Sequence, residues 1–448
     1  MRLLKATILG MLALVSVTVF IIPEVSADFE GGTVDTTSSV FMFLCTMLVF
    51  MMAPGIALFY GGMLRKQSMT SMMAQCIGVM AVVGVIWWAI GYSLAFGDSG
   101  NGFIGSLDYL FGADTPYDSG NGTMPWVQFM LFQGTFAIVT SCIVFGATAE
   151  RVRYPAILVF LALWSILVYA PMAHMVWGGG FLSAGLTSLG LPVQDFAGGT
   201  VVHICSGISG VAAALAIGRR SSRTDKGRSH NVPIMFIGCA LLWVGWFGFN
   251  CGSEGGFDEI TILAMENTFV ASCVSTVVWI IVQYIHVGRV SVTGLCAGVL
   301  AGLVGITPGC GFVEPWAAAV IGAVAAVVCY FGIIFMRKRK DIDDALDVMG
   351  VHGIGGIWGA ISVGVFSVAS LSWEGNGGLI AGQVDLLAGQ VVSVLVTLVY
   401  CFVVSFVLMK VIDYVMKSVG EKKGASLSES EQMVGSDIVE HGESSYLM

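Results

Sequence analysis

About eleven apolar segments run through the chain, and each is long enough to span the roughly 30 Å of hydrocarbon in a lipid bilayer. Backbone N–H and C=O groups inside a bilayer must hydrogen-bond within the segment, so we expect all of these segments to be helices. Only 11% of the 448 residues are charged and 56% are hydrophobic, which excludes a water-soluble enzyme. The sequence therefore predicts an all-α polytopic membrane protein that is not an enzyme. The predicted segments cover residues 37–62, 70–95, 126–149, 155–177, 199–218, 232–252, 260–286, 291–309, 315–336, 348–368 and 388–416.

Basic residues occur only in every second gap between these segments, and this alternation predicts the orientation. Apart from Arg2 and Lys5, all of the 20 Lys and Arg residues lie in alternate gaps or at the C-terminal end. The intervening gaps, including the long one at residues 97–125, contain neither. Because cytoplasmic loops carry an excess of Lys and Arg, we expect a multi-pass protein of the cell membrane with its mature N-terminus outside and its C-terminus in the cytoplasm.

The two ends of the chain differ from the predicted membrane domain at residues 28–416. Residues 1–27 carry two basic residues, an apolar run and the small-residue ending Val25-Ser26-Ala27, which is the pattern of a cleaved signal peptide. An uncleaved first helix is the alternative. Residues 417–448 are predicted to form a cytoplasmic tail. Its six acidic residues and several Ser favour a solvated, partly disordered segment by composition alone.

Two histidines lie inside predicted membrane segments, where ionisable groups are costly and usually functional. His203 follows Asp195 by eight residues, and His352 follows Asp344 by the same spacing. At 1.5 Å per residue each His lies about 12 Å from its own side of the bilayer, which leaves about 6 Å between their levels. We therefore expect the two rings to meet near the midplane. The alternative is that each His only fills packing space.

The shared spacing on the fifth and tenth segments also predicts an internal repeat. Residues 37–218 and 232–368 would form two halves of five segments each, and because five is odd the second half is inverted. Residues 388–416 would add one further helix. No metal site is expected at the histidines, because no further His, Cys or carboxylate recurs at ligand spacing beside them. Small residues at 294, 298 and 302 predict a tightly packed helix face.

Aromatic residues form a second group, which clusters toward the outer half of the membrane. It comprises residues 132–136, Trp177 and residues 246–253. One interpretation is a cation–π site for a small cation, worth about 2 kcal/mol when desolvated. The other is an interfacial belt, which accounts well for Trp126 and Trp373. Composition does not separate the two, although the net charge of −9 argues against a nucleic-acid partner.

These residues lie in stretches that resemble the ammonium transporter (Amt/Mep/Rh) family, most closely its bacterial and archaeal Amt branch. The stretches follow one another over almost the whole mature chain. They are residues 59–63, 132–136, 149–153, 173–179, 195–203, 245–253, 306–315 and 343–352. The chain departs from the family pattern at Cys205 and Ala297, where Asn is expected, and in a longer loop at residues 178–195. These departures affect packing detail and none of the pore residues.

The resemblance implies a role for each candidate site residue. In order from the outside, it implies a recruitment site of Phe136, Trp177 and Ser253, and then a gate formed by the stacked rings of Phe136 and Phe249. Below the gate it implies a narrow pore that contains His203 and His352. It also implies that Asp195 supports the site and that Phe132 lines the vestibule. It further implies a homotrimer, a cytosolic PII-type regulatory partner and no cofactor.

The function implied is ammonium transport. A full charge at the bilayer centre costs about 2.5 to 17 kcal/mol, more than an aromatic cage worth about 2 kcal/mol offsets over most of that range. We therefore expect the recruited cation to lose its proton near the histidines, ammonia to pass through the apolar pore, and the histidine pair to relay the proton. Two alternatives remain: a passive gas channel for ammonia or carbon dioxide, and an ammonium sensor that signals through the cytoplasmic tail.

Overall fold

The computed structural model describes residues 34–98, 100–221 and 229–446, so the predicted signal peptide lies outside the described residues. In this part of the chain, ten helices are long and apolar enough to cross a membrane, and the apolar helix α12 (Val292–Ile306) is shorter. Together they occupy the eleven predicted segments. The all-α membrane architecture is therefore confirmed.

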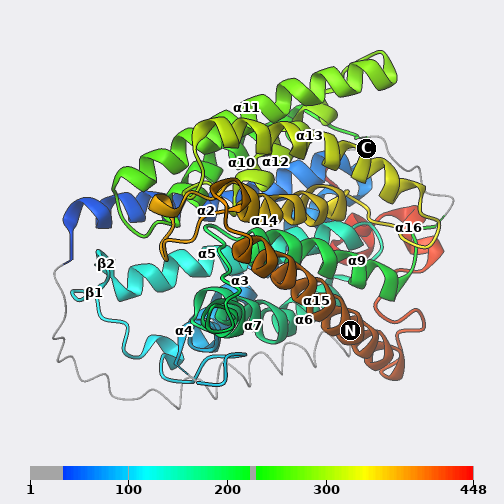
Figure 1. The fold of residues 1–448 in the computed structure, drawn as a ribbon. Helices are drawn as coiled ribbons and strands as arrows, with labels where there is room; N and C mark the ends of the chain where they lie inside the picture. Colours follow the sequence, from blue (N-terminus) through cyan, green and yellow to red (C-terminus); the bar gives the residue numbers. More distant parts are fainter. Residues whose placement is uncertain (1–33, 99, 222–228, 447–448) are drawn as a thin grey trace.

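The membrane helices pack side by side in one bundle (Figure 1). They are α2 (Thr36–Met63), α3 (Met69–Ile86) with α4 (Tyr92–Phe96), α5 (Trp126–Phe145), α6 (Tyr154–Trp164) with α7 (Ala170–Trp177), α9 (Cys205–Ile217), α10 (Val232–Gly252), α11 (Glu259–Val287), α12, α13 (Pro315–Lys338), α14 (Ile354–Phe366) and α15 (Asp385–Ser418). Wider π-helical segments continue four of these spans: η2 (Trp87–Gly91), η5 (Ser165–Tyr169), η7 (Gly199–Ile204) and η8 (Met349–Gly353). The remaining short elements are η1 (Lys66–Ser68), η3 (Leu110–Gly112), β1 (Gly120–Asn121), β2 (Met124–Pro125), η4 (Gly146–Thr148), η6 (Phe181–Gly185), α8 (Leu186–Ser188), η9 (Ala369–Leu371), η10 (Leu379–Ala381), α16 (Glu429–Val434) and η11 (Asp437–His441).

Polar caps fix where the long helices begin and end. The Asp35 carboxylate accepts a hydrogen bond of 2.6 Å from the backbone N–H of Ser38 at the start of α2. At the start of α11, Asp258 and Thr261 form a reciprocal capping box, and Gly288 ends the helix in the left-handed conformation. These caps satisfy backbone groups that have no partner within the helix, so the spans end where the chain returns to a polar environment.

Glycines allow neighbouring helices to approach closely, as the small-residue face of α12 predicted. A Cβ at Gly298 would lie 2.7 Å from Cβ of Trp279 in α11, and one at Gly302 would lie 2.6 Å from the carbonyl oxygen of Ala271. The same holds between α10 and α2, where a Cβ at Gly62 would lie 2.6 Å from the backbone nitrogen of Met235. Any larger residue at these positions would push the helices apart.

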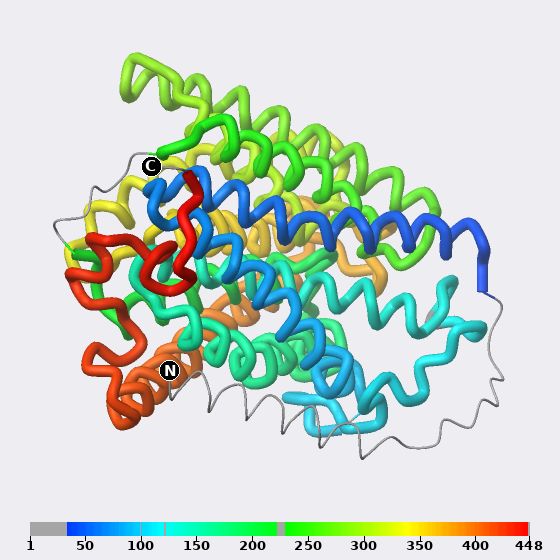
Figure 2. Tube along the Cα trace, turned by 180° about the vertical axis from the view of Figure 1, so that it is seen from behind, coloured from blue at the N-terminus to red at the C-terminus, as the bar shows by residue number. Residues whose placement is uncertain are grey.

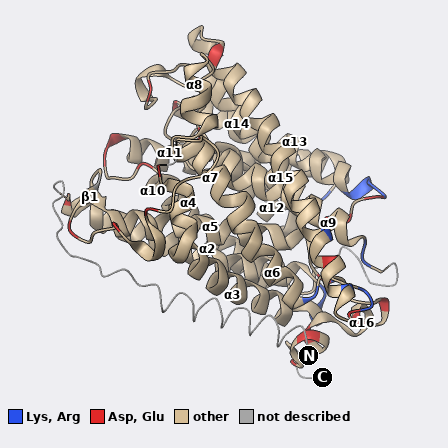
Figure 3. Cartoon of the chain, turned by 90° about the horizontal axis from the view of Figure 1, so that it is seen from below, with Lys and Arg blue, Asp and Glu red and all other residues tan. Residues whose placement is uncertain are grey.

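Charged residues are segregated between the two ends of the bundle (Figure 3). Lys and Arg gather at the end near α9 and α16, whereas the end that carries β1 shows Asp and Glu. At the basic end, Glu150 forms ion pairs with Arg65 at 2.9 Å and with Arg220 at 2.8 Å. Arg220 also pairs with Asp343 at 2.8 Å. This network ties together loops from both predicted halves of the chain.

The C-terminal tail packs against this basic end, so the expectation of a solvated, partly disordered tail is wrong for the described residues. Figure 2 shows the tail running across the start of α3. The Leu427 N–H donates to the Arg151 carbonyl oxygen at 2.7 Å, and the Ser71 N–H donates to the Asp437 carboxylate at the same distance. Arg153 pairs with Glu431 at 3.0 Å. Composition missed this docking because the acidic residues find their partners in distant loops.

Candidate functional site

Asp195 organises the backbone that carries His203. Its carboxylate accepts backbone N–H groups of Gly198 at 2.9 Å and Thr200 at 2.8 Å, together with the Thr200 hydroxyl. Gly198 has φ +111, and a Cβ there would lie 2.6 Å from the Val202 side chain, so the turn requires glycine. Burial raises the pKa of the Asp195 carboxyl, and these donors act in the opposite direction. Asp195 thereby satisfies the first N–H groups of η7, which begins inside the protein.

Asp344 does the same for the segment that carries His352. Its carboxylate accepts the backbone N–H groups of Val348 at 3.0 Å and Met349 at 2.7 Å. These donors stand four and five residues after the Asp, as Gly199 and Thr200 do after Asp195. Burial and the neighbouring Asp347 carboxylate raise the pKa of Asp344 to about 6. The repeated Asp–His spacing thus corresponds to the same local construction on η7 and η8.

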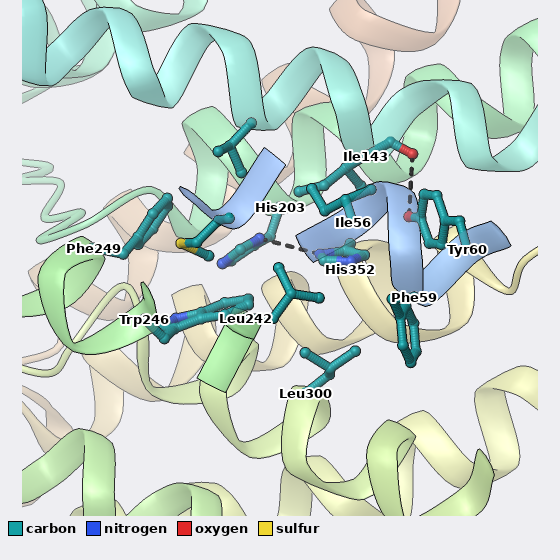
Figure 4. A pocket seen from close by; sticks show the side chains of 12 residues that line it. Ile56, Phe59, Tyr60, Ile143, His203, Leu242, Trp246, Phe249, Leu300 and His352 are labelled. Atoms are coloured by element: carbon teal, nitrogen blue, oxygen red, sulfur yellow. Dashed lines mark hydrogen bonds between the residues drawn. The ribbon is translucent and has the colours of Figure 1, made fainter. Parts of the chain in front are cut away.

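The two histidines meet in the middle of the bundle, as their spacing predicted (Figure 4). Nδ1 of His203 lies 3.3 Å from Nδ1 of His352, and the ring centroids are 5.3 Å apart. Since both rings use Nδ1, one must donate and the other accept. The approach depends on glycine, because a Cβ at Gly207 would strike the backbone of Gly353 and one at Gly356 would lie 2.9 Å from Cβ of His203.

Apolar side chains surround the histidine pair and leave only a narrow space. The cavity beside the rings measures about 20 Å³, and Figure 4 shows the rings between aliphatic and aromatic side chains. The His203 ring stacks on Trp246 with centroids 5.4 Å apart. His203 is 1% exposed and His352 is 8% exposed. The remaining ring nitrogen of His203, Nε2, is buried without a hydrogen-bond partner in the described structure. The cavity is lined by Met52, Ile56, Phe59, Tyr60, Val139, Ile143, His203, Leu242, Trp246, Phe249, Leu300 and His352.

Two stacked phenylalanines separate this narrow space from an outer cavity. The rings of Phe136 and Phe249 are 4.1 Å apart and nearly parallel, at 20°. Phe136 lines the outer cavity and Phe249 lines the narrow one. Phe136 and Phe249 therefore lie at the boundary between the two cavities.

The outer cavity measures about 380 Å³ and brings Phe136, Trp177 and Ser253 together. Trp177 meets Phe136 edge to face at 6.1 Å and donates its Nε1–H to the Asp195 carbonyl oxygen at 2.8 Å. The Ser253 hydroxyl donates to the Phe249 carbonyl oxygen at 2.9 Å, so toward a bound cation it acts only as an acceptor.

Phe132 takes a different position from the vestibule that the resemblance implied. It is 1% exposed and packs behind Phe136, with ring centroids 5.0 Å apart. Phe129, Gln133 and Phe136 of α5 line the outer cavity, and Phe132 does not. Phe132 therefore supports the Phe136 ring rather than facing the cavity.

Trp373 is a cavity residue that sequence reasoning assigned to an interfacial belt. It lies in the loop between α14 and α15 and lines the outer cavity. Its ring stacks on Phe196 at 5.3 Å and 20°, and meets Phe312 edge to face at 4.8 Å. No local sequence pattern indicates that Trp373 lines the cavity, since its contacts with Phe196 and Phe312 join loops that are far apart in the sequence.

A third cavity of about 640 Å³ opens on the basic side of the histidines. Phe59 and Leu300 line both this cavity and the narrow one, so the two lie next to each other with these side chains between them. Arg337 and Asp347 lie on its wall and form an ion pair at 2.5 Å. In the described part of the chain, no group of three or more His, Cys, Asp or Glu residues is placed to hold a metal ion. Outer cavity, stacked phenylalanines, histidine pair and inner cavity thus follow one another through the bundle.

Comparison with known proteins agrees with this arrangement. Residues 40–446 match the model of the Ammonium Transporter Family. The chain is 40% identical to an ammonium transporter of Bacillus subtilis (strain 168) over 410 residues, which is 91% of this chain and 98% of the relative. It superposes on the crystal structure of Mep2 from Candida albicans with a TM-score of 0.80 and 33% identity, over 89% of this chain and 88% of the other. A solved structure described as a sensor Amt protein also has a TM-score of 0.80, at 27% identity, over 90% of this chain and 97% of that one. By sequence and by fold, the chain belongs to the ammonium transporter family.

Proposed function

We propose that this protein transports ammonium by recruiting the cation outside, removing its proton, and passing ammonia through the narrow cavity. The outer cavity supplies the π faces of Phe136 and Trp177 and the acceptor oxygen of Ser253. Each of these groups attracts an ammonium ion, which carries charge and N–H donors together. Relatives at 38% to 40% identity that are named ammonium transporters support the substrate.

The observation that carries the mechanism is the Nδ1–Nδ1 contact of 3.3 Å between His203 and His352 inside an apolar cavity. A bare cation at this depth is costly, whereas ammonia is neutral. Linked imidazoles can take a proton at one nitrogen and release it at another, so they offer the proton a route through the same cavity. Potassium carries no proton and would be rejected.

Ammonium-evoked current in proteoliposomes tests this proposal. We expect His203→Ala and His352→Ala each to lose at least about tenfold in current, since no apolar neighbour replaces the proton route. We expect His203→Asp or His352→Asp to admit potassium, because a buried carboxylate favours a charged species. Leu242→Ala, which opens the same cavity without touching a ring nitrogen, is the matched control.

Two outcomes would contradict the relay. Undiminished current in both Ala variants, with potassium still excluded in both Asp variants, would reduce the histidines to packing residues. Net ammonia flux without any current in the wild-type protein would instead favour the passive gas channel.

A sensor is the second candidate function, because the solved structures that resemble this chain include one described as a sensor Amt protein. The docked tail supports it, since the Ser71–Asp437 bond links the tail to the start of a membrane helix. A sensor would bind ammonium and alter the tail contacts while carrying negligible current. The current measurement therefore separates the two candidates.

We further propose a homotrimer in the cell membrane, with the N-terminus outside, the C-terminus in the cytoplasm and a PII-type protein as cytosolic partner. Helix α11 is the least buried of the ten membrane spans. Its exposed side carries Glu266, two turns into the helix. A carboxylate at this depth is costly in lipid, so a protein neighbour suits this face better.

A further inference from the structure

Glu254 is a half-buried carboxylate at the outer mouth, directly after Ser253 of the outer cavity. It lies in the loop between α10 and α11. Its Oε2 accepts a hydrogen bond of 3.4 Å from Nε1–H of Trp373, which comes from the loop between α14 and α15. The carboxylate thus bridges two loops from different parts of the chain, on the side of the cavity where Ser253 lies.

The Trp373 side chain is 54% exposed, and ring contacts and its loop hold it in place beside the carboxylate. Besides its contacts with Phe196 and Phe312, its loop is tied down by Gln194, which is 4% exposed. The Gln194 amide donates to the Ser372 hydroxyl, and its oxygen accepts from the Ser367 hydroxyl at 3.1 Å. Because the Trp373 side chain lines the cavity and its N–H donates to Glu254, it links the cavity wall to the charge.

The charge of Glu254 is not neutralised by a basic neighbour. In the described part of the chain it forms no ion pair with Lys, Arg or His, and the basic residues gather at the opposite end of the bundle (Figure 3). The titratable groups around it are Asp258 of the same loop, Glu374 beside Trp373, and the Cys310 thiol from the turn after α12. A cation that enters the outer cavity therefore meets an uncompensated negative charge.

We propose that Glu254 determines the affinity of the outer site for ammonium-type cations, acting from beside the cavity as a carboxylate positioned by Trp373. This inference rests on the proposed function of the outer cavity as a cation site. It assigns an affinity-determining role to a residue outside the Phe136, Trp177 and Ser253 set. It also gives Trp373 a role beyond that of an interfacial aromatic.

A pH dependence follows from the surroundings of Glu254. Burial and the neighbouring Asp258 raise the pKa of Glu254 to about 7, while the Trp373 N–H lowers it. Above this pKa the side chain is an anion and attracts a cation, and below it the side chain is neutral. Cation affinity must therefore increase as the external pH rises through about 7.

Methylammonium uptake into proteoliposomes, at external pH 6 to 8 with fixed internal pH, tests the role. Methylammonium stays protonated over this range, so the probe itself does not change. We expect the wild-type apparent KM to fall about fivefold as pH rises, with little change in maximal rate. Glu254→Gln should hold KM at its low-pH value throughout. Trp373→Phe keeps the ring stack but removes the N–H donor, so it should move the midpoint to higher pH.

Glu314→Gln is the matched control. Glu314 is also an outer carboxylate that accepts a hydrogen bond from a tryptophan, Trp316, at 2.5 Å. It is exposed, and Trp316 does not line the outer cavity, whereas the Trp373 partner of Glu254 does. This variant removes the same amount of charge and should keep the wild-type pH dependence of KM. If Glu314→Gln flattened the profile as Glu254→Gln does, the effect would be one of total surface charge and the proposal would be overturned.

The remaining outcomes separate this inference from the proposed function. A wild-type pH dependence retained in Glu254→Gln would overturn the role of Glu254 and leave ammonium transport intact. Absence of uptake by the wild-type protein would refute the transport function. In that case tryptophan-fluorescence titration of the purified protein with methylammonium decides the binding role. An apparent affinity independent of pH, or one unchanged by Glu254→Gln, would overturn it.

Discussion

Trp177 belongs to the proposed recruitment site, since it meets Phe136 edge to face and donates its N–H to the Asp195 carbonyl oxygen. Trp177→Leu removes the π face and should raise the apparent KM for methylammonium about fivefold, as expected for a partly exposed cation–π contact. Trp177→Phe keeps an aromatic face and should retain most of the affinity. Uptake kinetics of the two variants side by side check this, and an unchanged KM in the Leu variant would place recruitment elsewhere.

The site residues that could be predicted from the sequence are those with an ionisable side chain in an apolar membrane segment, where such a group is costly to bury. Two histidines stand out in this way. Each follows an Asp by eight residues, and this shared spacing predicted that His203 and His352 lie at nearly the same depth in the membrane. Trp373 and Glu254 could not be found in this way, because a Trp at a membrane surface and a Glu in a loop are both ordinary. Their role depends on a contact between loops that only the folded chain brings together.

Among the elements, the C-terminal tail differs most from what its composition suggested. Truncation after Lys417 would remove the partners of Arg153 and the Asp437 acceptor that holds the Ser71 N–H at the start of α3. We expect this truncation to lower ammonium transport and to abolish any response to added PII-type protein. Uptake with and without that protein measures both effects, with the exposed Glu443→Gln variant as control.

A truncated protein with full activity and an unchanged response would show that the docked tail is dispensable.

The membrane helices could be predicted from the sequence, since a backbone that spans a bilayer must satisfy its hydrogen bonds within an apolar helix. The π-helical turns of η7 and η8 could not be predicted from the sequence. They depend on how Asp195 and Asp344 hold the backbone N–H groups, which hydrophobicity does not encode.

The whole molecule is polarised, with its basic residues at one end (Figure 3). The proposed orientation can be checked with single cysteines at exposed positions of opposite ends, such as Arg339→Cys and Asp118→Cys. Ten of the eleven native cysteines are buried and Cys273 is half-buried, so background labelling should be low. In intact cells we expect a membrane-impermeant maleimide to label position 118 and not 339. Labelling at 339 from outside would reverse the topology.

The close crossing of α9 with η8 restricts how the substrate preference of this protein can change during evolution. Gly207 and Gly353 bring two backbones into contact, so a bulkier residue at either position needs a simultaneous adjustment on the opposite helix. The loops of the outer rim meet through side chains such as Glu254 and Trp373 rather than through touching backbones, so a single replacement there needs less adjustment. New discrimination among substrates is therefore easier to acquire at the entrance than at the centre. Variation in this protein should accumulate in the loops around the outer cavity and be rare around the histidine pair.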